Sequence, residues 1–423
     1  MPKIAKLLGR EILDSRGTPT VLATCVLEGG VCASASVPSG TSTGTAEAFE
    51  LRDGDPKRYR GLGCRRAAAN VSTVLNGELA GRNFDQVDLD AAMIAFDGTA
   101  AKSRLGANAI LAVSVAFARA CARHQRLPLY QYFARMCGSK IRALPRLTIN
   151  LFSGGKHAGH QVSIQDVLII PMSAEMVDEA LVAASDVYHA ASELILKRHA
   201  MRPLTADEGG LAPPFREVDE MFALAAESIE RAGYRPGEDI FLAVDVASSH
   251  FFRDRRYHID SQALDSSAMI AKITDWLKRF PILSVEDGLA EDDWEHWPQL
   301  RKAIAGRALT LGDDLLCTNP TRIQRAVETS ACDALLLKVN QIGTLTEALA
   351  AYKQARAAGW SITLSVRSGE TEDNWAADLA AGWQADQFKN GSIRQSERLA
   401  KYNRLLEIAE ENDWALTEWP RRA

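Results

Sequence analysis

Three carboxylates and two lysines each follow a short apolar run in the later part of the chain. The carboxylates are Asp245, Glu286 and Asp313, and the lysines are Lys338 and Lys389. Carboxylate oxygens are the ligands that Mg²⁺ prefers in proteins. A lysine beside a cation has its ammonium form disfavoured and can act as a general base. A divalent ion opposite it can stabilise the enediolate that forms when a carboxylate substrate loses its α-proton. These residues therefore predict metal-assisted proton abstraction, provided that the fold brings them together.

Each carboxylate, taken alone, is more readily interpreted as a helix N-cap or a surface residue. Their shared position argues against that interpretation, because the apolar runs recur along the chain and alternate with amphipathic helical segments. The runs lie at residues 167–170, 240–244, 282–285, 308–311, 334–337 and 361–366. Continuous apolar strands separated by helices predict parallel β-strands that are buried on both faces. So many units predict a closed β/α barrel, whose carboxyl strand ends share one face.

The first part of the chain shows a different pattern. Two β-rich runs at residues 20–27 and 31–37 flank a Gly-Gly hairpin signal, and a loop of small polar residues follows at 38–45. Helical patterns then occupy residues 64–75, 86–96 and 108–125. Strands followed by helices predict an α+β unit. Because a single hydrophobic core stops growing at roughly 250–300 residues, we expect two domains, an N-terminal α+β capping domain at residues 1–135 and a catalytic barrel at residues 140–423.

The composition and net charge of the chain limit the classes of partner that it could bind. The chain has 423 residues, 47% hydrophobic and 24% charged, and its 49 basic and 54 acidic residues give a net charge of −5. A mildly acidic chain without a basic run is a poor candidate for binding nucleic acid or an anionic membrane. Its seven cysteines are scattered and form no C-x-x-C pair, and no His/Cys set of the zinc type is evident. This pattern and the lack of a signal-peptide hydrophobic region favour the cytoplasm.

The sequence resembles the enolase family over essentially its whole length. The matching stretches are residues 11–17, 37–44, 102–110, 207–210, 284–289, 312–314, 338–344 and 367–373. So many long matches in the same order are highly specific. The resemblance implies an enolase-type β/α barrel with an N-terminal capping domain. It also implies Mg²⁺ as cofactor, a small phosphorylated carboxylate as substrate, and a homodimer or higher homo-oligomer.

The resemblance also implies roles for the residues around the metal and the proton. Asp245, Glu286 and Asp313 match the ligands of a first Mg²⁺, and Ser39 looks like the lid position that helps to bind a second one. Lys338 matches the base that removes the α-proton.

The remaining matches concern the leaving group and the rest of the substrate. Glu208 looks like the acid that assists departure of the hydroxyl, and Lys389 like a cation held against the substrate carboxylate. Further matches to substrate-binding or catalytic positions are His157 on a mobile loop, Gln165, Asp166, and the phosphate clamp of Arg367 and Ser368. A planar guanidinium suits bidentate phosphate binding.

The chain departs from the family pattern inside the expected pocket. Enolases carry histidine where this chain has Val366, Gln-Glu where it has Gln165-Asp166, and glycine where it has Ala206. Val366 removes a protonatable group from beside the phosphate site. Asp166 draws a carboxylate back by about one C–C bond, roughly 1.5 Å, and a displacement near 1 Å can cost on the order of 100-fold in rate.

These departures favour a specialised paralogue that keeps the proton-abstraction chemistry on a changed substrate. The alternatives are a glycolytic enolase that converts 2-phosphoglycerate to phosphoenolpyruvate, an enzyme similar to the carboxyphosphonoenolpyruvate synthases of phosphonate biosynthesis, which would take a phosphonylated carboxylate, and a non-catalytic enolase-like protein. The intact carboxylates and both lysines argue against the last alternative.

Overall fold

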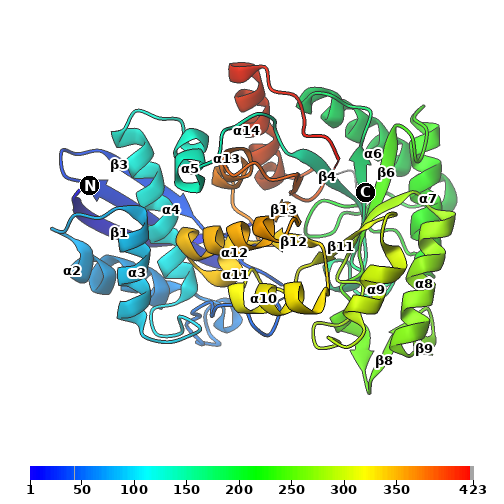
Figure 1. Ribbon diagram of the computed structural model, residues 1–423, viewed down its shortest axis with the longest axis horizontal. Helices are drawn as coiled ribbons and strands as arrows, with labels where there is room; N and C mark the ends of the chain where they lie inside the picture. Colours follow the sequence, from blue (N-terminus) through cyan, green and yellow to red (C-terminus); the bar gives the residue numbers. More distant parts are fainter. Residues whose placement is uncertain (42, 420–423) are drawn as a thin grey trace.

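The computed structural model describes residues 1–41 and 43–419, and it shows an N-terminal α+β unit beside a closed eight-stranded barrel (Figure 1). The N-terminal unit contains an antiparallel sheet in the order β1-β2-β3, with strands Ile4–Leu13, Pro19–Leu27 and Cys32–Ser36. Its helices are α1 (Arg65–Asn70), which continues through a π-helical turn at Val71–Leu75 into α2 (Asn76–Leu79), then α3 (Gln86–Asp97), α4 (Ala107–His124) and α5 (Leu129–Cys137). The small side chains of α4 are almost all buried, and this helix packs on β2 and β3.

The barrel closes in the order β10-β11-β12-β13-β14-β4-β5-β6. Its strands are β4 (Arg146–Ser153), β5 (Asp166–Pro171), β6 (Ile240–Asp245), β10 (Ile282–Glu286), β11 (Leu309–Gly312), β12 (Ala334–Leu337), β13 (Ser361–Ser365) and β14 (Gln387–Lys389). The helices that accompany them are α6 (Val177–His199), α7 (Val218–Arg231), α8 (Ser266–Arg279), α9 (Trp297–Ile304), α10 (Pro320–Thr329), α11 (Val339–Ile342), α12 (Leu345–Ala357), α13 (Trp375–Gly382) and α14 (Ser396–Asn412). A small sheet of β7 (Phe252–Arg253), β8 (Arg256–Ile259) and β9 (Gln262–Leu264) projects beside α8.

One strand corrects the expectation of an all-parallel barrel. β5 runs antiparallel to both β4 and β6, whereas the pairings from β6 through β10 to β14 and on to β4 are parallel. Parallel neighbours need a crossover connection, usually a helix, and the segment between β4 and β5 holds only the short 3₁₀ turn Gly155–His157. The reversal matters for the site, because the first residue of β5 now lies at the face where the other strands end.

Alternation along the strands separates two environments. Leu168, Ile170 and Ala243 form one small apolar cluster, and Leu309, Leu311, Ala334 and Leu336 form another, both distinct from the main core and both contacted by Trp419. Their neighbours Leu335 and Leu337 belong to the main core between strands and helices. Since side chains alternate across a strand, the two small clusters fill the barrel interior. Residues two positions further toward the carboxyl face therefore point into the same interior above them.

The segment after α14 returns across the other end of the barrel and is tied to β4. Arg146 is buried, and its Nε donates to the Thr417 carbonyl at 2.9 Å while NH1 donates to the Pro171 and Ala174 carbonyls at 2.8 and 3.1 Å. We expect Arg146→Met to lower the free energy of unfolding by about 3 kcal/mol, because charge-assisted bonds to buried carbonyls are lost. Chemical denaturation checks this, with the exposed Arg142→Met as matched control; equal stability of the two variants would contradict it.

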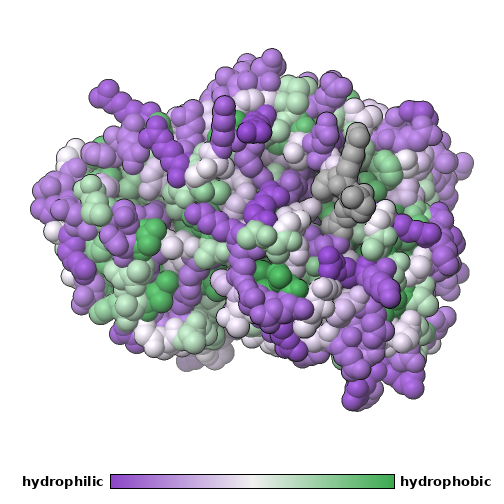
Figure 2. Space-filling model, viewed as in Figure 1, coloured by the Kyte–Doolittle hydropathy of each residue, from purple (hydrophilic) through white to green (hydrophobic). Residues whose placement is uncertain are grey.

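The face of the molecule drawn in Figure 2 is largely hydrophilic, with apolar residues scattered between the polar ones. Within residues 1–41 and 43–419, the helices are too short or too polar for any of them to span a bilayer.

Candidate active site

The carboxyl face of the barrel collects a row of acidic side chains from adjacent strands. Asp245 ends β6, and it pairs in register with Glu286 at the end of β10 and with Asp166 at the start of β5. Nζ of Lys389, the last residue of β14, lies 2.8 Å from Oδ2 of Asp245 and 2.7 Å from Oε2 of Glu286. The register of three neighbouring strands and one shared ammonium thus hold Asp245 and Glu286 together.

Asp313 follows β11 and is held by three further groups. Nζ of Lys338 donates to its Oδ2 at 2.5 Å, and Nε2 of Gln341 donates to its Oδ1 at 2.8 Å. The carboxylate of Asp287 accepts hydrogen bonds from the backbone N–H groups of Asp313 and Asp314, at 2.9 and 2.8 Å. Asp287 adopts a positive φ of 41°, an uncommon conformation that aims its carboxylate at this turn.

The charges of this group are strongly interdependent. Burial raises the pKa of Glu286 well above its usual range, and the Asp245 carboxylate adds to the rise. Burial opposes the positive charge of Lys389, but Asp245 and Glu286 outweigh it and hold the pKa of Lys389 well above its ordinary value. Burial likewise opposes the charge of Lys338, and Asp313 outweighs it, so the pKa of Lys338 is also raised.

The donor set fits a hard divalent cation. Asp245, Glu286 and Asp313 are only 2%, 3% and 6% exposed, and they offer carboxylate oxygens alone. Oε1 of Glu286 is buried without a hydrogen-bond partner among the described residues. A buried carboxylate oxygen left without a partner is costly, and oxygen ligands of this kind suit Mg²⁺. The chemistry of these three carboxylates thus fits such a cation, and Asp313 also forms a compact acidic group with Asp287 and Asp314, whose oxygens lie within 4.8 Å of one another.

A second wall of the site comes from the β4–β5 loop and the segment after α6. Nδ1 of His157 lies 3.4 Å from Oδ2 of Asp166 and 4.0 Å from Oε1 of Glu208. Nε2 of Gln165 donates to Oδ2 of Asp245 at 3.0 Å and links this wall to the first one. Burial alone would raise the pKa of Glu208, but the nearby charges of His157 and Arg398 lower it below its ordinary value.

The expected phosphate clamp is engaged by the capping unit. NH1 and NH2 of Arg367 lie 2.8 and 3.1 Å from the two carboxylate oxygens of Glu47. A Cβ on Gly40 would lie 2.0 Å from NH2 of Arg367, so only glycine allows this close approach. Oγ of Ser368 accepts a hydrogen bond from the backbone N–H of Thr41 at 3.1 Å. Glu47 therefore occupies both terminal nitrogens of the guanidinium.

Most of the residues predicted from the sequence converge. One cavity is lined by His157, Gln165, Glu208, Asp245, Lys338, Ser365, Val366, Arg367, Ser368 and Lys389. The predicted residues Asp166, Glu286 and Asp313 each contact one of these lining residues. Val366, at the point of departure from the family pattern, lines the same cavity as both lysines and the clamp.

Ser39 is the predicted site residue that the structure does not bring to the acidic group. Its Oγ donates to Oε2 of Glu50 at 3.0 Å and accepts from NH2 of Arg52 at 2.5 Å, both within the capping unit. Its backbone pairs with that of Gly369 beside the clamp, and its role as a ligand of a second metal stays a prediction. The neighbouring Ser42 of the same loop lies outside the described residues.

Four contributors were missed by sequence reasoning. Gln341 and Asp287 orient Asp313, Glu47 occupies Arg367, and Asn150 donates to Oε2 of Glu208 at 3.1 Å. Gln341 and Asp287 lie within the matching stretches 338–344 and 284–289, so a closer analysis of those motifs could have singled them out.

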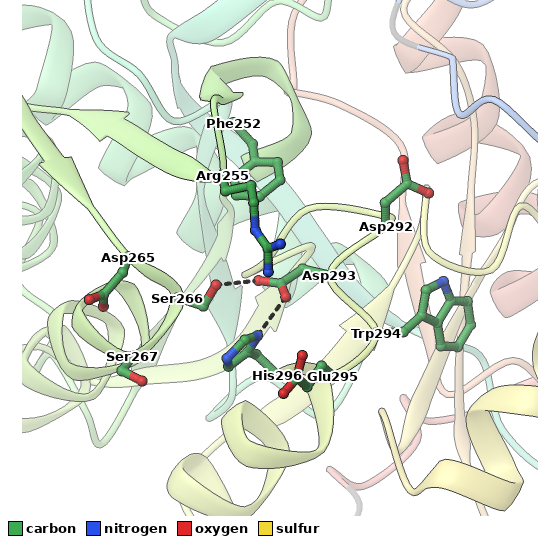
Figure 3. Close-up of a pocket in the computed structure, with 10 residues that line it drawn as sticks. All are labelled: Phe252, Arg255, Asp265, Ser266, Ser267, Asp292, Asp293, Trp294, Glu295 and His296. Atoms are coloured by element: carbon green, nitrogen blue, oxygen red, sulfur yellow. Dashed lines mark hydrogen bonds and ion pairs between the residues drawn. The ribbon is translucent and has the colours of Figure 1, made fainter.

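A second cavity lies beside the β7–β8 hairpin, the start of α8 and the segment before α9 (Figure 3). Asp293 is its central group. Its Oδ2 accepts from Tyr257 and Ser266, each at 2.7 Å, and its Oδ1 lies 2.6 Å from Nδ1 of His296. Because the residues predicted from the sequence line the other cavity, and because Asp293 is already paired, this cavity is not the candidate active site.

The fold and the residues gathered at the carboxyl face of its barrel are of the enolase type, and two family models match the chain. The family model described as the enolase N-terminal domain matches residues 4–133, and the one described as the enolase C-terminal TIM barrel domain matches residues 141–416. The chain belongs to the enolase family. This result confirms the predicted fold class and family, whereas the domain boundaries, the homo-oligomer and the residue roles stay predictions.

Proposed function

We propose that this protein is a Mg²⁺-dependent lyase that removes the proton α to the carboxylate of a small phosphorylated substrate, and that it is a specialised paralogue within its family. The observation that supports this most is the convergence of Lys338, Lys389 and Glu208 with the phosphate-clamp residues Arg367 and Ser368 around one cavity. Elimination from a phosphorylated hydroxy acid needs a base, an acid and a phosphate-binding group around one space. The two lysines, Glu208 and the clamp residues provide these groups around this cavity.

The residues divide the chemistry between two walls. Lys338, which must first part from Asp313 and release its own proton, accepts the α-proton at Nζ. Glu208 stands on the opposite wall and, once it has taken up a proton, delivers that proton to the departing hydroxyl. Lys389 places its positive charge against the substrate carboxylate. A divalent cation held by Asp245, Glu286 and Asp313 would supply further positive charge to that carboxylate as it accepts electron density.

The phosphate-binding step has a competitor within the chain. Glu47 binds both terminal nitrogens of Arg367, as a phosphate would. Both partners are buried, with side chains 2% and 8% exposed. A dianionic phosphate can displace Glu47 because it brings more charge to the same guanidinium. We therefore propose that the loop carrying Glu47 moves when substrate binds.

The preference for a paralogue depends on Val366 and Asp166. Val366 offers the cavity an apolar side chain next to Arg367, and Asp166 is fully buried with its Oδ1 bonded to Ser153. Losing one electrostatic contact to a transition state costs about 3–4 kcal/mol. Both lysines are retained, whereas residues expected around the leaving group and the phosphate are altered. This combination fits a related phosphoryl or phosphonyl compound better than 2-phosphoglycerate.

The deciding experiment incubates the purified protein with Mg²⁺ in D₂O, separately with 2-phosphoglycerate and with a 2-phosphonyl analogue of the same acid. Mass spectrometry follows deuterium at the α-carbon, and absorbance follows the enol product. We expect α-proton exchange, with slow elimination from 2-phosphoglycerate. Fast elimination from it would favour the glycolytic enolase, and turnover of the phosphonyl compound alone would favour the phosphonate enzyme. Absence of exchange with both compounds would contradict the proposal.

A further inference from the structure

Three groups on the second wall, His157, Asp166 and Glu208, form a cluster whose members are all buried. They are 8%, 0% and 7% exposed, and one ligand atom from each lies within 4.8 Å of the others. Within the described part of the chain, neither Nδ1 of His157 nor Oδ2 of Asp166 has a well-formed hydrogen bond, and the two atoms face each other as an ion pair. We call these residues the imidazole–carboxylate cluster.

The spacing inside the cluster is that of ligands around one ion. Transition cations hold nitrogen and oxygen ligands at about 2.0–2.2 Å, so neighbouring ligand atoms of a tetrahedral site lie roughly 3.4 Å apart. Nδ1 of His157 is 3.4 Å from Oδ2 of Asp166 and 4.0 Å from Oε1 of Glu208. A cation could bind between these three atoms with only small side-chain shifts.

In each carboxylate of the cluster, the oxygen that faces away from His157 already accepts a hydrogen bond. The oxygen that faces His157 is therefore available to a cation. Oγ of Ser153 donates to Oδ1 of Asp166 at 2.6 Å, and Nδ2 of Asn150 donates to Oε2 of Glu208 at 3.1 Å. Each carboxylate is thus fixed through the oxygen that faces away from His157. Hydrogen bonds of this kind orient the ligands in known metal centres, and their loss typically costs about 10–100-fold in metal affinity.

We propose that the imidazole–carboxylate cluster is an additional cation site, which prefers a transition ion such as Zn²⁺ or Mn²⁺ to Mg²⁺. An imidazole ligand favours such ions over Mg²⁺, whereas Asp245, Glu286 and Asp313 offer oxygen alone. The three ligands, spaced 9 and 42 residues apart, follow no zinc-motif spacing, so the site is recognised only when the loop, β5 and the segment after α6 come together. Because Glu208 is the acid of the proposed reaction, an ion bound here blocks proton delivery and inhibits the enzyme.

The test measures Zn²⁺ binding to metal-stripped protein by calorimetry in a large excess of Mg²⁺, which keeps the carboxylate site filled. We expect one tight Zn²⁺ per chain. His157→Asn should weaken it by at least about 100-fold, since removing a ligand costs more than removing an outer partner. The matched control is His160→Asn, an exposed histidine on the same loop, and it should leave binding unchanged. Ser153→Ala should weaken binding about 10-fold.

Two further measurements keep the outcome decisive. Asp313→Asn should retain the tight Zn²⁺, because its carboxylate belongs to the other site. Pulsed EPR of Mn²⁺ bound to the wild type in excess Mg²⁺ should show coupling to one imidazole nitrogen, which needs no variant to fold. Zn²⁺ binding that survives His157→Asn, or that disappears with Asp313→Asn alone, would overturn the proposal, as would a Mn²⁺ spectrum without nitrogen coupling.

Discussion

Replacing Lys338 by alanine should abolish exchange of the substrate α-proton. Lys338 lines the candidate active-site cavity, and its Nζ lies 2.5 Å from Oδ2 of Asp313, at the edge of the predicted cation site. A general base typically contributes about 100- to 10,000-fold, and we expect a loss of that size in the rate of deuterium incorporation at saturating Mg²⁺. Mass spectrometry of the recovered substrate measures it.

Two controls separate the loss of a base from other causes. Lys302→Ala removes an exposed lysine of α9 and should leave exchange unchanged. Lys338→Ala also frees Asp313 from its partner, so exchange should be followed across a Mg²⁺ titration to show that weaker metal binding does not explain the effect. A variant that exchanges at the wild-type rate would remove Lys338 from the role of base.

Much of the barrel was predictable because strands that are buried on both faces appear in the sequence as continuous apolar runs. Runs such as residues 240–244 and 334–337 are apolar on both faces, and each is followed by the charged residue that the structure places at the carboxyl face. The orientation of a strand, in contrast, could not be predicted from its composition. The run at residues 167–170 has the same composition in either orientation, and only the short β4–β5 connection reveals that β5 is reversed. β1 was missed because its exposure follows no clean alternation.

The residues of the candidate site likewise include some that the sequence could predict and some that it could not. Residues at strand ends, such as Asp245 and Lys389, could be predicted because their position follows from the fold. Contacts between the two domains could not be predicted, because they depend on how surfaces that are far apart in the sequence pack together. Glu47 pairs with Arg367 across 320 positions, and nothing local to Glu47 in the sequence indicates this. The hydrogen bonds of Ser39 to Glu50 and Arg52 likewise could not be predicted from the sequence, and its metal-binding role stays a prediction.

Restoring the family residues on the altered walls should raise turnover of 2-phosphoglycerate. Val366→His returns a protonatable group to the cavity beside Arg367, and Asp166→Glu advances a carboxylate by about 1.5 Å toward the space that His157 faces. A misplacement near 1 Å costs on the order of 100-fold in rate, so the double variant should gain at least about 100-fold. Absorbance of the enol product at saturating Mg²⁺ measures the gain.

The single variants and a size control show which wall matters. Val366 lines the cavity and Asp166 contacts His157, which lines the same cavity. Their effects should therefore not add independently, and a double-mutant cycle would give an interaction free energy above about 0.5 kcal/mol. Val366→Leu enlarges the side chain without adding a polar atom and should give no gain. If the wild type already turns over 2-phosphoglycerate as fast as the double variant, the altered residues do not set specificity and the paralogue proposal fails. If the double variant gains while α-proton exchange stays constant, the two substitutions act on departure of the leaving group, which is the step that the proposed function assigns to the second wall.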